Sequence, residues 1–283
     1  MIEPSLSLIV ATVGRTDELD ALFASLARQE GIVPTEWEVI VVDQNPPGMI
    51  DELCARWAAE LPLRHLRSDR HGASVNRNHG LDAARGTVVG FPDDDCTYYP
   101  DTLARIRDHF AVRPQGGVLL GQIIDRATGT KIGRRWPQRA RRVGSMIAYF
   151  FGYTFTIFTT YRKVRFDERL GPPLYFGGFE DVDYLLRCLQ VTGGADYDPS
   201  VQVWHPHFHL RFAPTAKLAA YGRGFGALCH KHLGPWYLAL FATSLVRNAM
   251  WMLHPYAAVR RNARASFAAK IAGFHDWPEG GHG

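Results

Sequence analysis

Cysteine is scarce in this sequence, and no charge of one sign dominates it. The cysteines among the 283 residues are Cys54, Cys96, Cys188 and Cys229. They form neither a C-x-x-C pair nor the Cys/His spacing of a structural zinc site, so buried, reduced thiols in a cytoplasm are expected. The net charge is +4. This charge is too small to favour a duplex-binding protein, so no nucleic-acid partner is expected.

The sequence also lacks a long uninterrupted apolar run. The first apolar segment, Leu6–Val13, is not preceded by the basic flank of a signal peptide and is not followed by a cleavage site of small residues. The second, between Trp236 and Val259, is interrupted by Arg247-Asn248 and by Pro255. We therefore expect no membrane-spanning helix, and any contact with a membrane should be peripheral, at its inner face.

What the sequence does contain is a regular alternation of apolar runs and amphipathic segments, which predicts an α/β fold. The predicted strands are 6–13, 38–43, 63–66, 87–91, 118–124, 154–160 and 197–203. The predicted helices are 17–29, 50–61, 74–85, a segment around 103–110, and one that begins near 180. This order favours a mostly parallel, doubly wound sheet with helices on both faces. Residues 1–213 should form this domain, and residues 214–283, which are helical, aromatic and basic, a C-terminal appendage.

Three carboxylates, Asp93, Asp94 and Asp95, follow an apolar strand directly. If this segment is extended, Asp93 and Asp95 point the same way, and two such charges are costly unless a cation joins them. Carboxylate oxygens, with diphosphate oxygens completing the shell, suit Mg²⁺ or Mn²⁺. The same residues also suit a solvated turn or a helix cap before Pro100, and the run by itself does not decide between these roles.

A second acidic pair, Glu180 and Asp181, lies at the start of the amphipathic helix predicted near 180. The helix dipole keeps a carboxylate ionised at this position, which suits a group that accepts a proton. Capping of the helix is the alternative use of the pair. The pattern alone leaves both open.

Several short motifs occur together in the order typical of one family. The matching segments are Thr12-Val13-Gly14-Arg15 (T-x-x-R), Val41-Val42-Asp43 (V-V-D), Gly72 to Gly80 with Arg77 and Asn78 (G-x-x-x-A-R-N-x-G), Asp93 and Asp95 (D-x-D), Phe166-Asp167-Glu168 (F-D-E) and Glu180-Asp181 (E-D). Over roughly its first two-thirds the chain thus resembles family 2 of the glycosyltransferases, which are inverting nucleotide-sugar enzymes of the GT-A fold. It departs from the family pattern at Asn76, at Cys96 and at Gln44-Asn45-Pro46.

The resemblance implies a role for each matched residue. Asp181 would be the catalytic base, Asp43 would contact the nucleobase, and Arg77 would bind the diphosphate or a neighbouring carboxylate. The metal, Mn²⁺ or Mg²⁺, would be held by Asp93, Asp95 and a late histidine, for which His205 is the candidate in the run Trp204 to His209. The remaining candidate donor-binding residues are Thr12, Arg15, Asp93, Asp94 and Glu180. The other interpretation of the run Trp204 to His209 is a surface histidine cluster.

Basic and aromatic residues are concentrated in two places outside these motifs. Five arginines surround Trp136 between Gly133 and Arg142, and the C-terminal region mixes aromatic with basic residues. Such patches attract phosphates or anionic lipid headgroups, which is consistent with a glycan or lipid-linked glycan acceptor in polysaccharide biosynthesis. Packing on the catalytic domain, or a homodimer interface, would account for the C-terminal apolar residues equally well.

Two other functions compete with the glycosyltransferase reading. A nucleotidyltransferase also binds nucleotide sugars on a doubly wound sheet, but it needs a glycine-rich G-x-G-T-R loop that Ala11 to Arg15 does not supply. The second competing function is that of a catalytically degenerate, membrane-peripheral scaffold in a polysaccharide assembly complex. The retained Asp93, Asp95 and Asp181 argue against it. The donor nucleotide is taken as UDP by family frequency.

Overall fold

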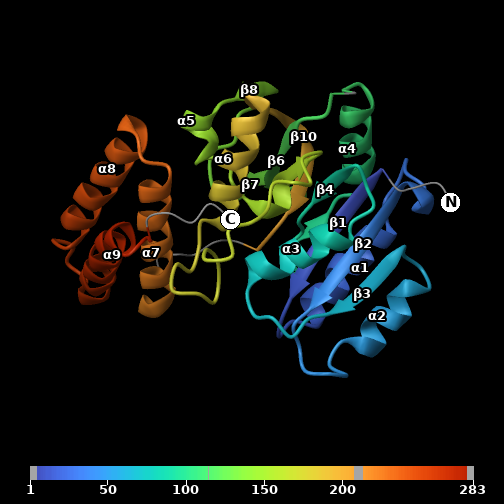
Figure 1. Ribbon diagram of the computed structural model, residues 1–283, viewed down its shortest axis with the longest axis horizontal. Helices are drawn as coiled ribbons and strands as arrows, with labels where there is room; N and C mark the ends of the chain where they lie inside the picture. Colours follow the sequence, from blue (N-terminus) through green and yellow to red (C-terminus); the bar gives the residue numbers. More distant parts are fainter. Residues whose placement is uncertain (1–4, 114, 207–212, 279–283) are drawn as a thin grey trace. The chain divides into compact units, whose positions relative to one another are not determined.

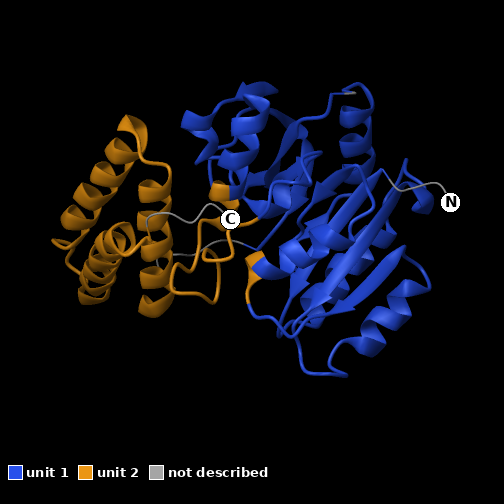
Figure 2. Cartoon of the chain, viewed as in Figure 1, with its two compact units in different colours: residues 1–71, 75–165, 184–208 blue, residues 72–74, 166–183, 209–283 orange. Residues whose placement is uncertain are grey.

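The computed structural model describes residues 5–113, 115–206 and 213–278. They form two compact units, which Figure 2 colours separately. Unit 1 comprises residues 1–71, 75–165 and 184–208, and unit 2 comprises residues 72–74, 166–183 and 209–283. Unit 2 thus takes in a central segment as well as the C-terminal region. The predicted division at residue 213 between a catalytic domain and an appendage stays a prediction.

Unit 1 is built on one sheet with the strand order β3-β2-β1-β4-β9-β6-β10-β5 (Figure 1). The long strands are β1 (Leu6–Thr12), β2 (Trp37–Asp43), β3 (Leu63–Arg67), β6 (Val118–Asp125) and β10 (Ala195–Trp204). The short ones are β4 (Val88–Gly90), β5 (Thr97–Tyr98), β7 (Thr130–Lys131), β8 (Arg141–Val143) and β9 (Ile157–Thr159). Strands β3, β2, β1 and β4 are parallel, as are β6 and β10, while β9 joins the two groups as an antiparallel strand.

Helices surround this sheet and bury its apolar side chains. The helices of unit 1 are α1 (Asp17–Ala27), α2 (Asp51–Ala58), α3 (Ala73–Ala83), α4 (Thr102–Ala111), α5 (Ser145–Ala148) and α6 (Glu180–Thr192). The first residues of α3 and α6 are grouped with unit 2. Two 3-10 turns, Pro34–Glu36 and Thr154–Thr156, precede β2 and β9. Helix α3 lies close on β1 because Gly80 has no side chain: a Cβ there would lie 2.2 Å from a methyl carbon of Ile9. The predicted α/β class with a mostly parallel sheet is confirmed.

Among its described residues, unit 2 contains three whole helices: α7 (Thr215–Lys231), α8 (Pro235–Trp251) and α9 (Ala257–His275). Small residues let α7 and α9 approach at backbone distance. A Cβ on Gly226 of α7 would lie 2.1 Å from the carbonyl oxygen of Lys270, and one on Gly273 of α9 would lie 2.0 Å from that of Arg223. Within the described part of the chain, no helix is both long enough and apolar enough to cross a membrane.

Candidate metal and nucleotide site

The candidate residues of unit 1 follow the carboxyl ends of neighbouring parallel strands. Thr12 ends β1, Asp43 ends β2, and the tripeptide 93–95 comes three residues after Gly90 ends β4. The register pairs Thr12 with Asp43 across β1 and β2. Because parallel strands end at the same edge of a sheet, these side chains share one edge, which is where open α/β sheets bind ligands.

The acidic tripeptide forms a turn, so the expected extended segment was wrong. The amide of Cys96 donates to the carbonyl of Asp93 at 3.1 Å, which closes the turn. The middle residue, Asp94, points inward: its carboxylate accepts from the Thr12 hydroxyl at 2.8 Å and from the Arg15 guanidinium at 2.7 Å. Thr12 and Arg15 therefore fix the turn after β4 against the end of β1.

The turn and the end of β10 bring Asp93, Asp95 and His205 together. One ligand atom from each of the three residues lies within 4.8 Å of the others. The Nε2 atom of His205 lies 3.1 Å from Asp95 Oδ1, and its ring stacks on Phe155 at a centroid distance of 4.6 Å. Nδ1 lies 2.7 Å from the carbonyl oxygen of Pro206, which can only accept, so Nδ1 carries the hydrogen. Nε2, which faces Asp95, is then the ring nitrogen that can bind a cation once it has lost its own proton.

The charges of this group are mutually stabilising. Burial opposes ionisation of Asp95, but hydrogen bonds from His205 and Arg15 outweigh it and lower the pKa of Asp95 below its ordinary value. Burial likewise opposes protonation of His205, yet its bonds to Asp95 and Pro206 raise the pKa of His205. Burial raises the pKa of Asp94 despite the adjacent Arg15. The carboxylate of Asp95 is therefore available as an anion more readily than that of Asp94.

Arg77 of α3 contacts the same group of residues. Its guanidinium is largely buried and donates to Asp93 Oδ1 at 2.8 Å. Thr154, which precedes β9, lies 3.4 Å from both the guanidinium and the Asp93 carboxylate. Of the two partners expected for Arg77, the structure shows the neighbouring carboxylate. Thr154 was not expected at this site, because its position next to Asp93 depends on an antiparallel strand far away in the sequence.

A second polar cluster surrounds Asp43. Its side chain is fully buried, and each of its carboxylate oxygens has two partners. Oδ1 accepts from the backbone and side-chain nitrogens of Asn45 at 2.8 and 2.9 Å. Oδ2 contacts His65 Nε2 at 3.0 Å and accepts from Arg67 at 2.7 Å. A carboxylate has about four acceptor positions, so Asp43 has no position left for a nucleobase in this conformation.

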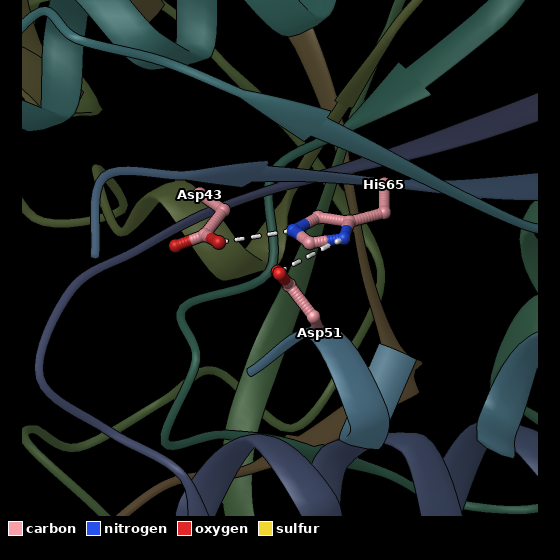
Figure 3. Close-up of side chains that lie close together, drawn as sticks. All are labelled: Asp43, Asp51 and His65. Atoms are coloured by element: carbon pink, nitrogen blue, oxygen red, sulfur yellow. Dashed lines mark hydrogen bonds and ion pairs between the residues drawn. The ribbon is translucent and has the colours of Figure 1, made fainter. Parts of the chain in front are cut away.

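Asp51 completes this cluster at the start of α2. Figure 3 shows the imidazole of His65 between the carboxylates of Asp43 and Asp51. Arg67 Nη1 lies 2.7 Å from Asp43 and 3.0 Å from Asp51, so one guanidinium already pairs with both acids. The side chains of Asp51 and Arg67 are 49% and 38% exposed and form the accessible rim of the cluster. Sequence reasoning missed His65, Arg67 and Asp51; the one available signal was the β2–β3 register, which pairs Asp43 with Arg67.

The acidic pair Glu180 and Asp181 is grouped with unit 2 and forms the first turn of α6, as predicted. Glu180 is buried and Asp181 is half-buried. The residue before them, Phe179, has a φ of 69°, a left-handed conformation that is rare for a bulky side chain and is held here by ring contact with Phe225. His207 and His209 of the histidine-rich run lie outside the described residues.

A buried ion-pair network holds the same turn of α6 within unit 2. Asp183 is fully buried and contacts Lys231 and His232 at 2.8 Å each. Lys231 also contacts Asp167 at 2.7 Å, and Arg169 contacts Asp167 at 2.6 Å. Burial opposes ionisation of Asp167, but these cations lower its pKa far below the ordinary value. Asp167 of the F-D-E segment and Asp183, two residues after the E-D pair, are thus fixed to the end of α7.

Comparison with known proteins agrees with this geometry. A family model described as "Glycosyl transferase family 2" matches residues 7–169, which is more than half of the chain. The chain belongs to this family. Among curated family relatives, a PGL/p-HBAD biosynthesis glycosyltransferase of Mycobacterium tuberculosis (strain ATCC 25618 / H37Rv) is 29% identical over 47% of this chain and 52% of its own length. An uncharacterized glycosyltransferase of Haemophilus influenzae is 23% identical over 73% of this chain and 69% of its own length.

Solved structures extend the likeness to nearly the whole chain. S. aureus TarS in complex with UDP-GlcNAc has a TM-score of 0.60 at 17% identity, covering 98% of this chain and 93% of that one. The mannosyltransferase PcManGT from Pyrobaculum calidifontis, in complex with GDP-Man and Mn²⁺, has a TM-score of 0.62 at 17% identity, covering 98% and 88%. The GT-A fold expected for a member of glycosyl transferase family 2 is therefore confirmed. The chain spans about half the length of the mycobacterial relatives that it matches.

Proposed function

We propose that this chain is an inverting, metal-dependent glycosyltransferase. It would transfer a sugar from a nucleotide diphosphate donor, by default a UDP-sugar, to an acceptor hydroxyl. The observation that carries the proposal is the convergence of Asp93, Asp95 and His205 at the carboxyl edge of the parallel strands, in a chain of this family. A nucleotide-sugar donor is also supported by the complexes of the two structural neighbours, which hold UDP-GlcNAc and GDP-Man.

The donor set fits a divalent cation. Two carboxylates and an imidazole Nε2 face one another, and the structure orients the imidazole through Pro206. Oxygen-rich sites of this kind suit Mn²⁺ or Mg²⁺. Such a cation, when bound, neutralises charge on the departing nucleotide diphosphate. The chain's part is to hold the ligands: Arg77 orients Asp93, while Arg15 orients Asp95 and, with Thr12, Asp94.

We assign nucleobase recognition to the rim of the second cluster. Because Asp43 already has four partners, it would act by positioning Arg67 and Asn45. Arg67 then offers donors, and Asp51 offers acceptor oxygens, to the polar edge of a base. A uracil presents such an edge, with a ring N–H between two carbonyl oxygens.

Asp181 is proposed as the base that removes the proton of the acceptor hydroxyl, on the strength of the family's E-D motif. The first turn of α6 favours its ionised form, as a base requires. Glu180 would contribute to donor binding. We place the reaction in the cytoplasm, with a lipid-linked glycan as the acceptor in polysaccharide biosynthesis, and a homodimer remains a separate proposal.

The test is an Asp95→Asn variant, which keeps the size of the side chain and removes one ligand charge. Two readouts are followed: nucleotide release from UDP-glucose, UDP-GlcNAc and GDP-mannose with MnCl₂, in which water replaces the acceptor hydroxyl, and the thermal shift that each donor produces with and without Mn²⁺. We expect the Mn²⁺-dependent shift to disappear and nucleotide release to fall on the order of 100-fold. Asp108→Asn, at a carboxylate 66% exposed on α4, is the matched control.

Two results would contradict the proposal. If Asp95→Asn retains the Mn²⁺-dependent shift, the cation lies elsewhere. If no donor shifts the melting temperature of the wild-type chain, with or without Mn²⁺, the scaffold alternative gains and the nucleotide-sugar assignment fails.

A further inference from the structure

Helix α8 presents an apolar face outward. Leu238, Val246 and Met250 are 46%, 60% and 68% exposed, and Leu253, just beyond the helix, is 85% exposed. At 100° per residue these positions share one stripe with the exposed Pro235, Ala239, Ala242 and Ala249. The opposite stripe holds the buried Tyr237, Ser244 and Asn248. A helix on a water-facing surface normally has the reverse pattern, so this face needs a covering partner.

The charge around this face selects the partner. No aspartate or glutamate occurs from Gly234 to His275. Arg247 on α8 and Arg261 and Arg264 in the first turns of α9 are exposed, and only residues 252–256 separate the two helices. An apolar surface on a segment that carries exposed arginines and no acidic residue fits an anionic lipid bilayer. A second copy of the same face fits poorly, because a two-fold contact would bring the arginines of both copies together.

Aromatic side chains occur where α8 ends and in the turn that follows it. Trp251 is 37% exposed and Tyr256 is 71% exposed. Both rings contact the imidazole of His254 at a centroid distance of 5.3 Å, so the three side chains form one cluster. Tryptophan and tyrosine favour the headgroup layer of a bilayer, where one end of the ring is apolar and the other is wet.

We infer that α8 lies in the plane of an anionic membrane, with the stripe from Leu238 to Leu253 inserted among the lipids. Trp251 and Tyr256 then sit at headgroup level, and Arg247, Arg261 and Arg264 contact lipid phosphates. The inference uses no residue of the metal or nucleotide cluster, so it does not depend on the proposed activity.

Co-sedimentation of the full chain with vesicles tests this surface. The vesicles are pure phosphatidylcholine, or phosphatidylcholine with about 30% phosphatidylglycerol as the anionic lipid. The chain should bind the anionic vesicles and bind them less in high salt. Val246→Glu should lower the partition coefficient about tenfold or more, since it places a charge on the inserted stripe. Val191→Glu on α6 is the control, because Val191 is also 60% exposed in a helix.

A second variant tests whether Arg261 and Arg264 contact lipid phosphates. Replacing Arg261 and Arg264 together with glutamine should weaken binding to the anionic vesicles about tenfold and leave the weak binding to neutral vesicles unchanged. Equal loss on both vesicle types would overturn the assignment of these arginines to lipid phosphates.

Four results would overturn the membrane assignment as a whole. The wild-type chain could fail to bind anionic vesicles, or Val246→Glu could bind as Val191→Glu does. Alternatively, Val246→Glu could dissociate a dimer in sedimentation velocity without vesicles, or lower the melting temperature where Val191→Glu does not; the stripe would then contact a second copy or another part of the chain. Donor-induced thermal shifts of Val246→Glu, measured alongside, show whether the nucleotide site is intact in either case.

Discussion

At the scale of single residues, Asp43 shows how a motif residue can act through its neighbours. The V-V-D motif predicted a carboxylate that contacts the base, but the side chain is fully buried, and Asn45, His65 and Arg67 use its acceptor positions. The exposed polar groups of this cluster belong to Asp51 and Arg67. Under the proposed function, recognition and support are divided between different residues of one cluster.

This division makes Asp51 and Asp43 respond differently to mutation. Asp51→Ala should lower the affinity for UDP about tenfold and leave the melting temperature unchanged, because it removes one exposed acceptor. Asp43→Asn should reduce the free energy of unfolding by about 3 kcal/mol, because an amide cannot accept from four donors and leaves Arg67 without its buried counter-charge. Calorimetric titration with UDP and urea unfolding measure the two effects.

Asp20→Ala is the control for Asp51, since Asp20 is a similarly exposed carboxylate, at 44%, that also pairs with an arginine. If Asp51→Ala binds UDP as the wild type does, and a stably folded Asp43→Asn variant loses affinity for UDP, then Asp43 itself contacts the base.

At the scale of helices and strands, the packing of α7 on α9 depends on glycines. A Cβ at Gly226 would lie 2.1 Å from the carbonyl oxygen of Lys270 and 2.5 Å from the amide of Phe274, both backbone atoms that cannot rotate away. Gly226→Ala should therefore lower the free energy of unfolding by about 2 kcal/mol, even though alanine is the better helix former by about 1 kcal/mol. Urea unfolding followed by tryptophan fluorescence measures the change.

Gly144→Ala is the matched substitution, because a Cβ at Gly144 meets nothing within 4 Å. Equal stability of the two variants would mean that α7 and α9 can separate without cost, and that the close approach does not hold them together.

The long elements could be predicted from the sequence, and of the short strands only β4 and β9 could. Continuous apolar runs marked β1, β2 and β6, and the spacing of Leu103, Ile106 and Phe110 marked α4 within one or two residues. Strands β5, β7 and β8 have two or three residues each and left no periodic pattern. In β8 the arginines dominated the interpretation, but Arg142 pairs with Asp196 of β10, a contact that is invisible along the sequence.

The candidate site shows the same limit. Asp93, Asp95 and His205 could be proposed together because a family motif and a strand end pointed to each of them. Thr154, His65 and Arg67 could not, because their place beside Asp93 and Asp43 follows from strand order and register. Local sequence predicts which residue types end a strand, and pairing between distant strands decides which of them meet.

At the scale of the whole molecule, chain order and compactness divide the protein differently. The change in composition near Pro214 suggested a boundary at residue 213, yet residues 166–183 are grouped with residues 209–283. The ion pairs of Asp167 and Asp183 with Lys231 account for this grouping, together with the close contact between Gly178 and Gly224, where a Cβ on Gly224 would lie 2.3 Å from the Gly178 carbonyl oxygen. The E-D motif thus belongs to the compact unit that also holds the C-terminal helices.

Within that turn, Asp181 and Asp183 allow chemistry to be separated from folding. Asp183 is fully buried and contacts the Lys231 ammonium and the His232 imidazole, so Asp183→Asn should destabilise the chain by about 3 kcal/mol. Asp181 is half-buried, and its carboxylate accepts from the amide of Val182 at 2.7 Å. Asp181→Asn should therefore melt close to the wild type, retain the Mn²⁺-dependent thermal shift with donor, and lose between about 10²- and 10⁴-fold in turnover, the contribution of a general base. Turnover is measured as nucleotide release. Near-normal turnover in a folded Asp181→Asn variant would show that another group accepts the proton, and a loss of donor binding in the same variant would place Asp181 in the binding machinery.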